Sequence, residues 1–334
     1  MTPRDQTNSA VTAIAHPNIA LVKYWGKDDL TRNLPATGSV SITLDTLMTR
    51  TTVAIAPDGK DRFELEGREE TAMAARTFRY LDAHLGADRP RLSITSENNF
   101  PTAAGLASSA SGFAALVVAI NALLDRHAAQ SVMAQAAGAG SGSAARSLFG
   151  GFARLDKATS DTDDIRVQQL APAAHFPLAV VVAVTAEGRK PIGSTEAMIQ
   201  SRDTSPYYDR WVADQEGDLD TAENAILRQD FEALATVSEH SCLKMHAVMQ
   251  TTQPSLLYWN AATIACMHEV SAMRRDGVGV FFTIDAGPQL KAVCLPADRD
   301  RVASALADVP GVKRLIHAGL GDGARVISGA ADLD

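Results

Sequence analysis

Cysteine is scarce in this sequence, and the few cysteines stand apart. The 334 residues include Cys242, Cys266 and Cys294, and no two of them form a Cys-x-x-Cys pair. An odd number of isolated cysteines gives no closed disulfide framework, so a reducing compartment is the simpler expectation. Aromatic residues make up only 5% of the chain, and we therefore expect small aliphatic side chains to do much of the packing.

An excess of positive charge is also absent. The 31 lysines and arginines are outnumbered by 39 aspartates and glutamates, which gives a formal net charge of −8, and no long basic run occurs. A chain of this kind is a poor nucleic-acid binder. A local basic pocket for a small anion remains compatible with this balance, because net charge says little about a single cleft.

No apolar run is long enough to form a membrane helix. The longest runs, Phe176–Val184 and Phe113–Leu124, fall short of the roughly 20 residues that a span requires. The N-terminal residues also lack the basic-then-apolar pattern of a secretory signal. These absences predict a soluble, cytoplasmic protein without a membrane partner.

Metal-binding motifs are missing as well. There is no His-Glu-x-x-His, and Cys266 and His268 lack two further ligands at metal spacing. Structural zinc needs four ligands and catalytic zinc three. The sequence therefore argues against a zinc site.

The strand and helix patterns that are present favour an α+β fold. Residues 195–275 have a helical pattern, and an apolar helix ends near Leu124. Strands and helices are segregated along the chain rather than alternating, which favours α+β over a doubly wound sheet. The length fits two domains or one large one. We predict two, residues 1–185 and 186–334, with the boundary near residues 175–190. Strands are predicted at residues 11–20, 39–45, 49–57, 91–97, 176–185, 278–288 and 291–296.

A loop of small residues, Pro101–Ser109, lies between a predicted strand and the apolar helix. Small side chains let the backbone approach a ligand, and the free N–H groups and dipole at a helix start favour a phosphate. Ser108 and Ser109 offer hydroxyls to a phosphate or to a magnesium ion. The loop is neither a Walker loop nor a Gly-x-Gly-x-x-Gly motif. A tight turn with close helix packing is the alternative interpretation.

A second Gly/Ser stretch, Gly140–Arg146, is predicted to open a helix and to precede a return strand. It combines backbone donors and two hydroxyls with a guanidinium, whose planar fork matches a carboxylate or phosphate. A flexible linker with a surface arginine is the alternative. The stretch runs directly into the apolar segment SLFGGF, which favours the anion site.

Two further segments are ambiguous when each is taken alone. In Asn18–Lys27, Lys23 and Lys27 flank a Tyr-Trp pair, and the simpler interpretation is a basic patch with buried aromatics. Asp285 follows a buried strand and precedes Ala-Gly-Pro. Such a position suits a general base, but in isolation a turn-initiating aspartate is the simpler interpretation.

Taken together and in this order, the four segments are more specific. PNIALVKYWGK, ENNFPTAAGLASSASG, GSGSAARSLFGGF and FFTIDAGP resemble the GHMP kinase superfamily and, within it, the diphosphomevalonate decarboxylase family. The resemblance covers most of the chain. It implies a two-lobed α+β fold, with a ribosomal S5 domain 2-like N-terminal lobe, a ferredoxin-like C-terminal lobe and the active site between them.

The resemblance also implies a reaction. ATP, with Mg2+, would phosphorylate the C3 hydroxyl of mevalonate 5-diphosphate, and loss of phosphate and CO2 would then give isopentenyl diphosphate. The family further suggests a homodimer.

Individual residues take roles from the same resemblance. Asp285 matches the catalytic aspartate, and Arg146 and Asn18 would hold the substrate carboxylate. Lys23 would lie near the aspartate and the substrate. The phosphate end of the substrate would contact Tyr24, Lys27, Ser141, Ser143 and Ser194. The ATP phosphates would contact Asn98, Pro101, Ala104, Gly105, Leu106, Ala107, Ser108 and Ser109, with Ser108 near the metal.

Two departures from the family pattern leave alternatives open. Family members often carry an arginine at the start of the helix near residues 68–75, aimed at the terminal phosphate, and the alignment here places Glu69 and Glu70 there. Unless Arg68 substitutes, the substrate would be mevalonate 5-phosphate and the product isopentenyl phosphate. A 3-kinase without decarboxylation is a further alternative. Gln289, where the family usually has asparagine, has no interpretation from sequence.

Overall fold

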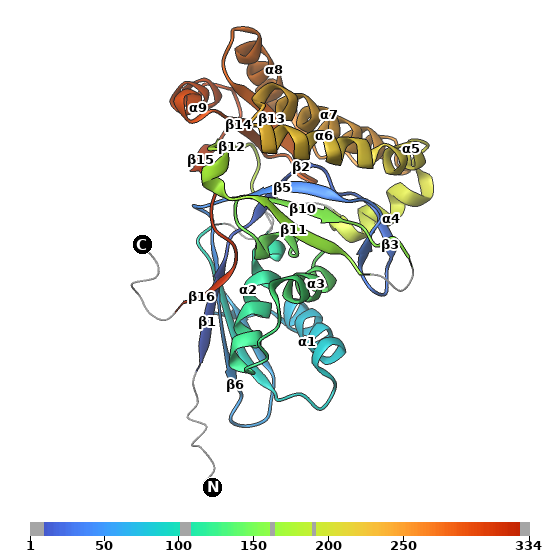
Figure 1. Ribbon diagram of the computed structural model, residues 1–334, viewed down its shortest axis with the longest axis vertical. Coiled ribbons are helices and arrows are strands. Elements are labelled where there is room, and N and C mark those ends of the chain that lie inside the picture. The colour runs from blue at the N-terminus through green and yellow to red at the C-terminus, as the bar shows by residue number, and fades with distance from the viewer. Residues whose placement is uncertain (1–9, 101–107, 161–163, 189–191, 328–334) are drawn as a thin grey trace.

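The structure is a computed structural model that describes residues 10–100, 108–160, 164–188 and 192–327. Figure 1 shows an N-terminal half at the bottom, C-terminal helices at the top and a sheet between them. The described strands form three larger sheets and one two-stranded hairpin.

The N-terminal sheet has the strand order β16–β1–β6–β9–β7–β8. Helix α2 packs on β1 and β6, and α3 packs on both α2 and the neighbouring sheet. Enclosure from several sides explains why α2 is apolar around most of its circumference. The strands are β1 (Val11–Ala15), β6 (Thr49–Ile55), β7 (Arg62–Leu65), β8 (Arg68–Glu69), β9 (Leu92–Asn98) and β16 (Arg325–Ile327), and the helices are α1 (Thr71–Leu85), α2 (Ser108–Leu123) and α3 (Gln130–Gly140).

The middle sheet has the order β11–β10–β5–β2, which leaves β2 at an edge. Helices α6 and α7 pack against β2 from the C-terminal half. A short hairpin, β3–β4, follows β2 along the chain. The strands are β2 (Asn18–Val22), β3 (Lys27–Asp29), β4 (Leu34–Pro35), β5 (Ser39–Thr43), β10 (Phe152–Asp156) and β11 (Arg166–Ala171), and a 3-10 turn, η1 (Arg146–Leu148), precedes β10.

The C-terminal sheet is antiparallel, with the order β13–β14–β12–β15. Its strands are β12 (Ala179–Val184), β13 (Val280–Ile284), β14 (Leu290–Cys294) and β15 (Arg314–Ala318). The helices are α4 (Ser194–Thr204), α5 (Tyr208–Ala213), α6 (Gln215–Arg228), α7 (Phe231–Gln250), α8 (Ala261–Arg275) and α9 (Arg299–Ala307), and the 3-10 turns are η2 (Ala173–His175) and η3 (Pro296–Asp298).

Strand β12 is buried on both faces, as its continuous apolar composition predicts. Val180 and Val182 belong to a core shared with the middle sheet, whereas Val181 belongs to a second core under α8 and α9. Successive side chains point to opposite faces of a sheet, so one strand serves two cores. Alanine and valine are common in these cores, in agreement with the low aromatic content.

The structure confirms most of the predicted elements and corrects two. Residues 11–20 are not one strand, because the chain breaks at His16-Pro17 and β1 and β2 enter different sheets. Proline lacks the N–H that a continuous ladder needs. The Gly/Ser stretch at 138–145 opens no α-helix: Gly140 ends α3, and only the 3-10 turn η1 follows. The predicted helical region is confirmed, although residues 251–260 connect α7 to α8 without helix.

Sheet membership bears on the domain boundary. β12 pairs with β14 and β15, while β16 returns to pair with β1. The chain changes sheet between β11 and β12, and the last described strand returns to the N-terminal half; the predicted boundary at residue 185 stays a prediction.

Two predictions from composition can be compared with the described residues. The three cysteines are buried and form no disulfide. None of the described helices combines the length and apolar character that crossing a bilayer needs.

Candidate active site

Asp285 lies directly after β13 and is held between two lysines. Its Oδ1 accepts a hydrogen bond from Lys23 Nζ at 2.6 Å, and its Oδ2 lies 3.0 Å from Lys291 Nζ. Both lysines are almost completely buried, at 1% and 2% exposure, while 30% of the aspartate side chain is exposed. The carboxylate is therefore the part of this cluster that a ligand can reach.

The two lysines determine the ionisation of Asp285. Burial alone would raise its pKa, but attraction to Lys23 and Lys291 outweighs burial and holds the pKa well below the ordinary value. Burial lowers the pKa of Lys291, and its attraction to Asp285 offsets part of that effect. Asp285 is thus a firmly ionised carboxylate and a weak base.

Arg146, in η1, is a buried cation with polar but uncharged partners. Its Nε and Nη2 donate to Asn18 Oδ1 at 3.1 and 2.9 Å, and its Nη1 donates to Ser39 Oγ at 2.6 Å. Asn18 is oriented in turn, because its Nδ2 donates to Ser143 O and Ser147 Oγ. Arg146 is only 2% exposed, and within the described residues no carboxylate forms an ion pair with it.

This environment suits Arg146 to bind an anion. Burial lowers its pKa to about 10, while Tyr24 and Asp285 act in the opposite direction, so the guanidinium stays protonated at neutral pH. Guanidinium carries five N–H donors, and the contacts above use three. One N–H on each Nη remains, which matches the two oxygens of a carboxylate.

Tyr24 and Lys27 lie on the same side as the Gly/Ser stretch. Lys27 Nζ donates to Asn33 O at 3.2 Å and lies 5.3 Å from the centre of the Tyr24 ring. The ring packs so closely on Gly142 that a Cβ there would lie 2.5 Å from the tyrosine oxygen, so a residue other than glycine would displace the ring. The Tyr24 hydroxyl is buried and has no hydrogen-bond partner in the described residues.

The charge of Lys27 is sensitive to its surroundings. Burial lowers its pKa to about 8, and repulsion from Arg76 contributes. A buried ammonium without a carboxylate partner is costly, so an anion arriving beside it would be stabilised. Tyr24 and Lys27 thus fit the predicted contacts to the phosphate end of a substrate.

Arg76 is a basic residue at this site that the sequence analysis missed. It lies on α1, its Nη2 donates to Gly140 O at 2.6 Å, and its guanidinium lies 5.1 Å from the centre of the Phe113 ring. Arg68, the substitute considered from sequence, lies on β8; both arginines are exposed, but it is Arg76 whose guanidinium contacts the Gly/Ser stretch. Arg76, in the second turn of α1, is therefore a candidate for the positive charge that the sequence lacks at Glu69 and Glu70.

The ATP-phosphate loop is only partly within the described residues. Pro101, Ala104, Gly105, Leu106 and Ala107 lie outside them. Ser109 is within them, and its Oγ lies 3.2 Å from Ser141 Oγ, which places the start of α2 beside the Gly/Ser stretch. Asn98, Ser108 and Ser109 line a small cavity of about 50 Å³.

Ser194 and Gln289 lie in different segments, Ser194 at the start of α4 and Gln289 in the segment after Asp285. The predicted contact of Ser194 with substrate stays a prediction. Gln289 is buried; its Oε1 accepts from Thr185 N at 2.7 Å and its Nε2 donates to Ala186 O at 2.6 Å. This residue, which had no interpretation from sequence, ties the end of β12 to the segment after Asp285.

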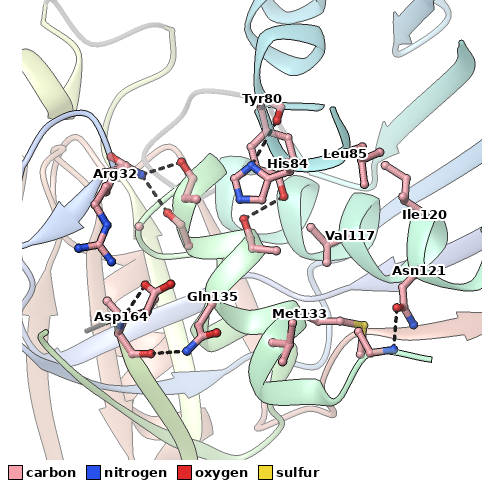
Figure 2. A pocket seen from close by; sticks show the side chains of 18 of the residues that line it. Arg32, Tyr80, His84, Leu85, Val117, Ile120, Asn121, Met133, Gln135 and Asp164 are labelled. Carbon is pink, nitrogen blue, oxygen red and sulfur yellow. Dashed lines mark hydrogen bonds between the residues drawn. The ribbon is translucent and has the colours of Figure 1, made fainter. Parts of the chain in front are cut away.

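A cavity of about 440 Å³ lies between α1, α2 and α3. Figure 2 shows Leu85, Val117, Ile120 and Met133 toward one end and Arg32 and Asp164 at the other. Of the described residues in the segments predicted to form the site, only Gly142 lines this cavity. The candidate active site is instead the cluster around Asp285, Arg146 and Lys27.

Comparison with known families covers both halves of the chain. The family model described as Diphosphomevalonate decarboxylase-like N-terminal domain matches residues 15–166. The model described as Mevalonate 5-diphosphate decarboxylase C-terminal domain matches residues 180–326. The chain belongs to the diphosphomevalonate decarboxylase family.

Relatives and solved structures of the diphosphomevalonate decarboxylase family support this at full length. The Diphosphomevalonate decarboxylase of Candida albicans is 35% identical over 350 aligned residues, covering 94% of this chain and 97% of the relative. The crystal structure of mevalonate diphosphate decarboxylase from Staphylococcus aureus is 33% identical with a TM-score of 0.90, covering 97% and 99% of the two chains. A structure of MDDEF in complex with MVAPP, AMPPCP and magnesium is 32% identical, with a TM-score of 0.88 over 97% and 100%.

The predicted family and the two-lobed α+β fold are thereby confirmed. Three residues of this diphosphomevalonate decarboxylase site escaped the sequence analysis: Ser39, Arg76 and Lys291. A signal existed for Lys291, because a lysine inside the buried strand Leu290–Cys294 is costly without a partner. Ser39 and Arg76 stand in ordinary surroundings in the sequence, and only the fold brings them to the site.

Proposed function

We propose that this protein catalyses the ATP-dependent decarboxylation of mevalonate 5-diphosphate. ATP transfers its terminal phosphoryl group to the C3 hydroxyl, the C3–O bond then breaks with loss of phosphate, and the C–C bond to the carboxylate breaks with loss of CO2. The products are ADP, phosphate, CO2 and isopentenyl diphosphate. The single observation that carries this proposal is an ionised Asp285 that interacts electrostatically with Arg146, a buried cation without a carboxylate partner in the described residues.

Asp285 acts through its charge and position more than as a strong base. Because its pKa lies well below the ordinary value, it takes a proton reluctantly. It can accept a hydrogen bond from the tertiary hydroxyl and orient it toward ATP. When the C3–O bond breaks, positive charge develops at C3, and a fixed carboxylate stabilises it.

Arg146 holds the carboxylate that is lost. Its two remaining N–H groups suit a bidentate contact, and Asn18 and Ser39 fix the plane of the guanidinium. An oriented carboxylate lets the breaking C–C bond align with the empty orbital that develops at C3.

The phosphate end of the substrate would lie against Tyr24, Lys27, Ser141 and Arg76. Two cations and an unpartnered hydroxyl suit a diphosphate better than a monophosphate, because each phosphate group brings further charge and acceptor oxygens. The solved complex of a relative with MVAPP supports the same choice. The 5-phosphate alternative rested on an absent arginine, and Arg76 removes that reason.

ATP would bind with its phosphates at the start of α2, where Ser108 and Ser109 lie. The described residues contain no group of three or more His, Cys, Asp or Glu side chains arranged to hold a metal. A magnesium ion here would therefore take most of its ligands from ATP, with the Ser108 hydroxyl as a protein ligand, which fits the preference of Mg2+ for phosphate oxygens and water. When bound, the ion neutralises negative charge on the phosphates.

The competing reaction is phosphorylation of the C3 hydroxyl without decarboxylation. Product analysis separates the two: the proposal expects ADP, phosphate and CO2 in equal amounts from mevalonate 5-diphosphate and ATP. ADP without CO2 would identify a 3-kinase instead.

We further propose a homodimer, which rests on the family resemblance alone. The proposed cytoplasmic location rests instead on the isolated cysteines, which suit a reducing compartment. Light scattering coupled to size-exclusion chromatography tests the assembly. A single species at twice the chain mass is expected, and a species at the mass of one chain would contradict it.

A further inference from the structure

Lys291 gives Asp285 a second lysine contact, so that each oxygen of the carboxylate has its own lysine. It lies in β14, pairs with Thr283 across the β13–β14 hairpin and with Val182 of β12, and its side chain is 2% exposed. Because β13 and β14 are rigidly paired, the lysine on one strand faces the carboxylate that follows the other. Lys23 reaches the opposite oxygen from beyond the end of β2.

The charges of this cluster do not balance. One carboxylate and one lysine would already form a neutral buried pair, and a second buried lysine adds a positive charge. Burying a charge costs free energy unless it is compensated. Stability of the fold therefore does not account for Lys291, since an apolar side chain of similar length would fill the same space without that cost.

We propose that Lys291 is a positioning residue that holds the second carboxylate oxygen of Asp285 and fixes the plane of that carboxylate against the C3 hydroxyl. This inference rests on the proposed function. With Lys23 alone, the carboxylate can rotate about its Cβ–Cγ bond while keeping one contact. With a lysine on each oxygen, that rotation breaks at least one ion pair.

Lys291 also helps to keep Asp285 ionised. The acid limb of a pH profile reports this ionisation if the neighbouring groups do not titrate in the same range. Burial lowers the pKa of His246 to about 3 and raises that of Cys242, so both stay neutral near neutral pH. Among the described residues, the titratable groups that interact electrostatically with the carboxylate include Lys23, Lys291, Arg146, Cys242 and His246. Removing one of the cations raises the pKa of Asp285. Replacing it with an apolar side chain introduces no new group that titrates in the assay range.

The variant Lys291→Met tests the proposal, because methionine keeps the length and apolar stem of the lysine. We expect kcat to fall about 10- to 100-fold through misplacement of the carboxylate. We also expect the acid limb of the kcat profile to move to higher pH by about one pH unit, since one of two attracting charges is lost. Thermal stability of the free protein should be unchanged or higher.

The matched control is Lys244→Met, which removes a lysine from another ion pair, 2.6 Å from Asp218. It should leave kcat and the acid limb unchanged. If Lys291→Met keeps the parent kcat and pH profile, the proposal is wrong. It is also wrong if activity falls equally at all pH values together with a lower melting temperature, because that pattern describes a structural residue.

A second measurement does not depend on the reaction. Carboxyl-carbon NMR of aspartate-labelled protein, with Asp285→Asn to assign the signal, follows the ionisation of Asp285 directly. The signal should titrate at higher pH in Lys291→Met than in the parent, and identical titrations would overturn the proposal. If the parent released no CO2, the proposed function would fail, but this titration would still decide whether Lys291 controls the Asp285 carboxylate.

Discussion

Lys23 and Asp285 are 262 residues apart in the chain, and a hydrogen bond of 2.6 Å joins them. Two consecutive residues of helix α7 accept hydrogen bonds from the backbone of Lys23 and from that of Ile284, the residue before Asp285. Ser241 Oγ accepts from Lys23 N at 2.9 Å, and Cys242 Sγ accepts from Ile284 N at 3.2 Å. The Lys23–Asp285 pair is thus assembled by one helix, α7, which packs against β2 of the middle sheet and β13 of the C-terminal sheet.

Replacement of Asp285 should remove turnover and leave nucleotide binding intact. In Asp285→Asn the side chain keeps its size but loses the charge that stabilises C3, so we expect kcat to fall about 10²- to 10³-fold. Steady-state assays measure kcat, and titration with a fluorescent ATP analogue measures nucleotide affinity. Asp276→Asn, at the exposed end of α8, is the control. Full turnover in Asp285→Asn would refute the assigned role.

Arg146→Lys should behave as a severe change despite the retained charge. Lysine cannot reproduce the contacts to Asn18 and Ser39 and also present two donors to a carboxylate. We expect kcat/KM for the mevalonate substrate to fall about 10- to 100-fold, measured beside Arg166→Lys on the exposed edge of β11. An unchanged kcat/KM would show that the two guanidinium N–H groups do not bind the substrate carboxylate.

Tyr24 and Tyr80 form a matched pair for testing substrate contact. The Tyr24 hydroxyl is buried without a partner in the described residues, whereas that of Tyr80 donates to Ala136 O at 2.9 Å. Tyr24→Phe should keep its melting temperature but raise KM for substrate about tenfold, because a bond to a charged ligand is lost. Tyr80→Phe should lose about 1 kcal/mol of stability with KM unchanged. The reverse pattern would contradict the placement of the phosphate end.

Lys27 predicts how substrate binding depends on pH. Burial, with a contribution from Arg76, lowers its pKa to about 8, so the free protein loses this proton as the pH rises through that value. A bound diphosphate favours the protonated form, and binding should therefore weaken above about pH 8 and take up protons near it. Calorimetry in buffers of different ionisation enthalpy measures the uptake. Lys27→Gln should abolish it; uptake that persists in this variant would assign the proton to another group.

The sequence was sufficient to predict the fold class, the helical region at 195–275 and each of Lys23, Arg146 and Asp285 as a candidate. It could not show that Lys23 and Asp285 are paired, because that contact depends on how α7 packs between two sheets. The role of Gly140 was misread for a physical reason. Glycine at the end of α3 allows the close approach of Phe113, whose ring lies 2.2 Å from where a Cβ would be, and composition does not distinguish this from a loop.

Arg76 shows the same limit at a single residue. In sequence, it is one of two arginines on the amphipathic helix α1, and the alignment drew attention to Glu69 and Glu70 instead. Its contact with Gly140 depends on the packing of α1 against α3. The charge that the pocket needs was present, but its position could be read only from the fold.

Specificity for the 5-diphosphate is the central claim, and the most direct test is CO2 release from mevalonate, its 5-phosphate and its 5-diphosphate, each with ATP. We expect the highest kcat/KM with the 5-diphosphate. The ratio of kcat/KM for the 5-diphosphate to that for the 5-phosphate should shrink about tenfold in Arg76→Gln. It should not shrink in Arg79→Gln, the control on the same helix. Higher kcat/KM with the 5-phosphate, or ADP formed without CO2 from any of the three, would contradict the account.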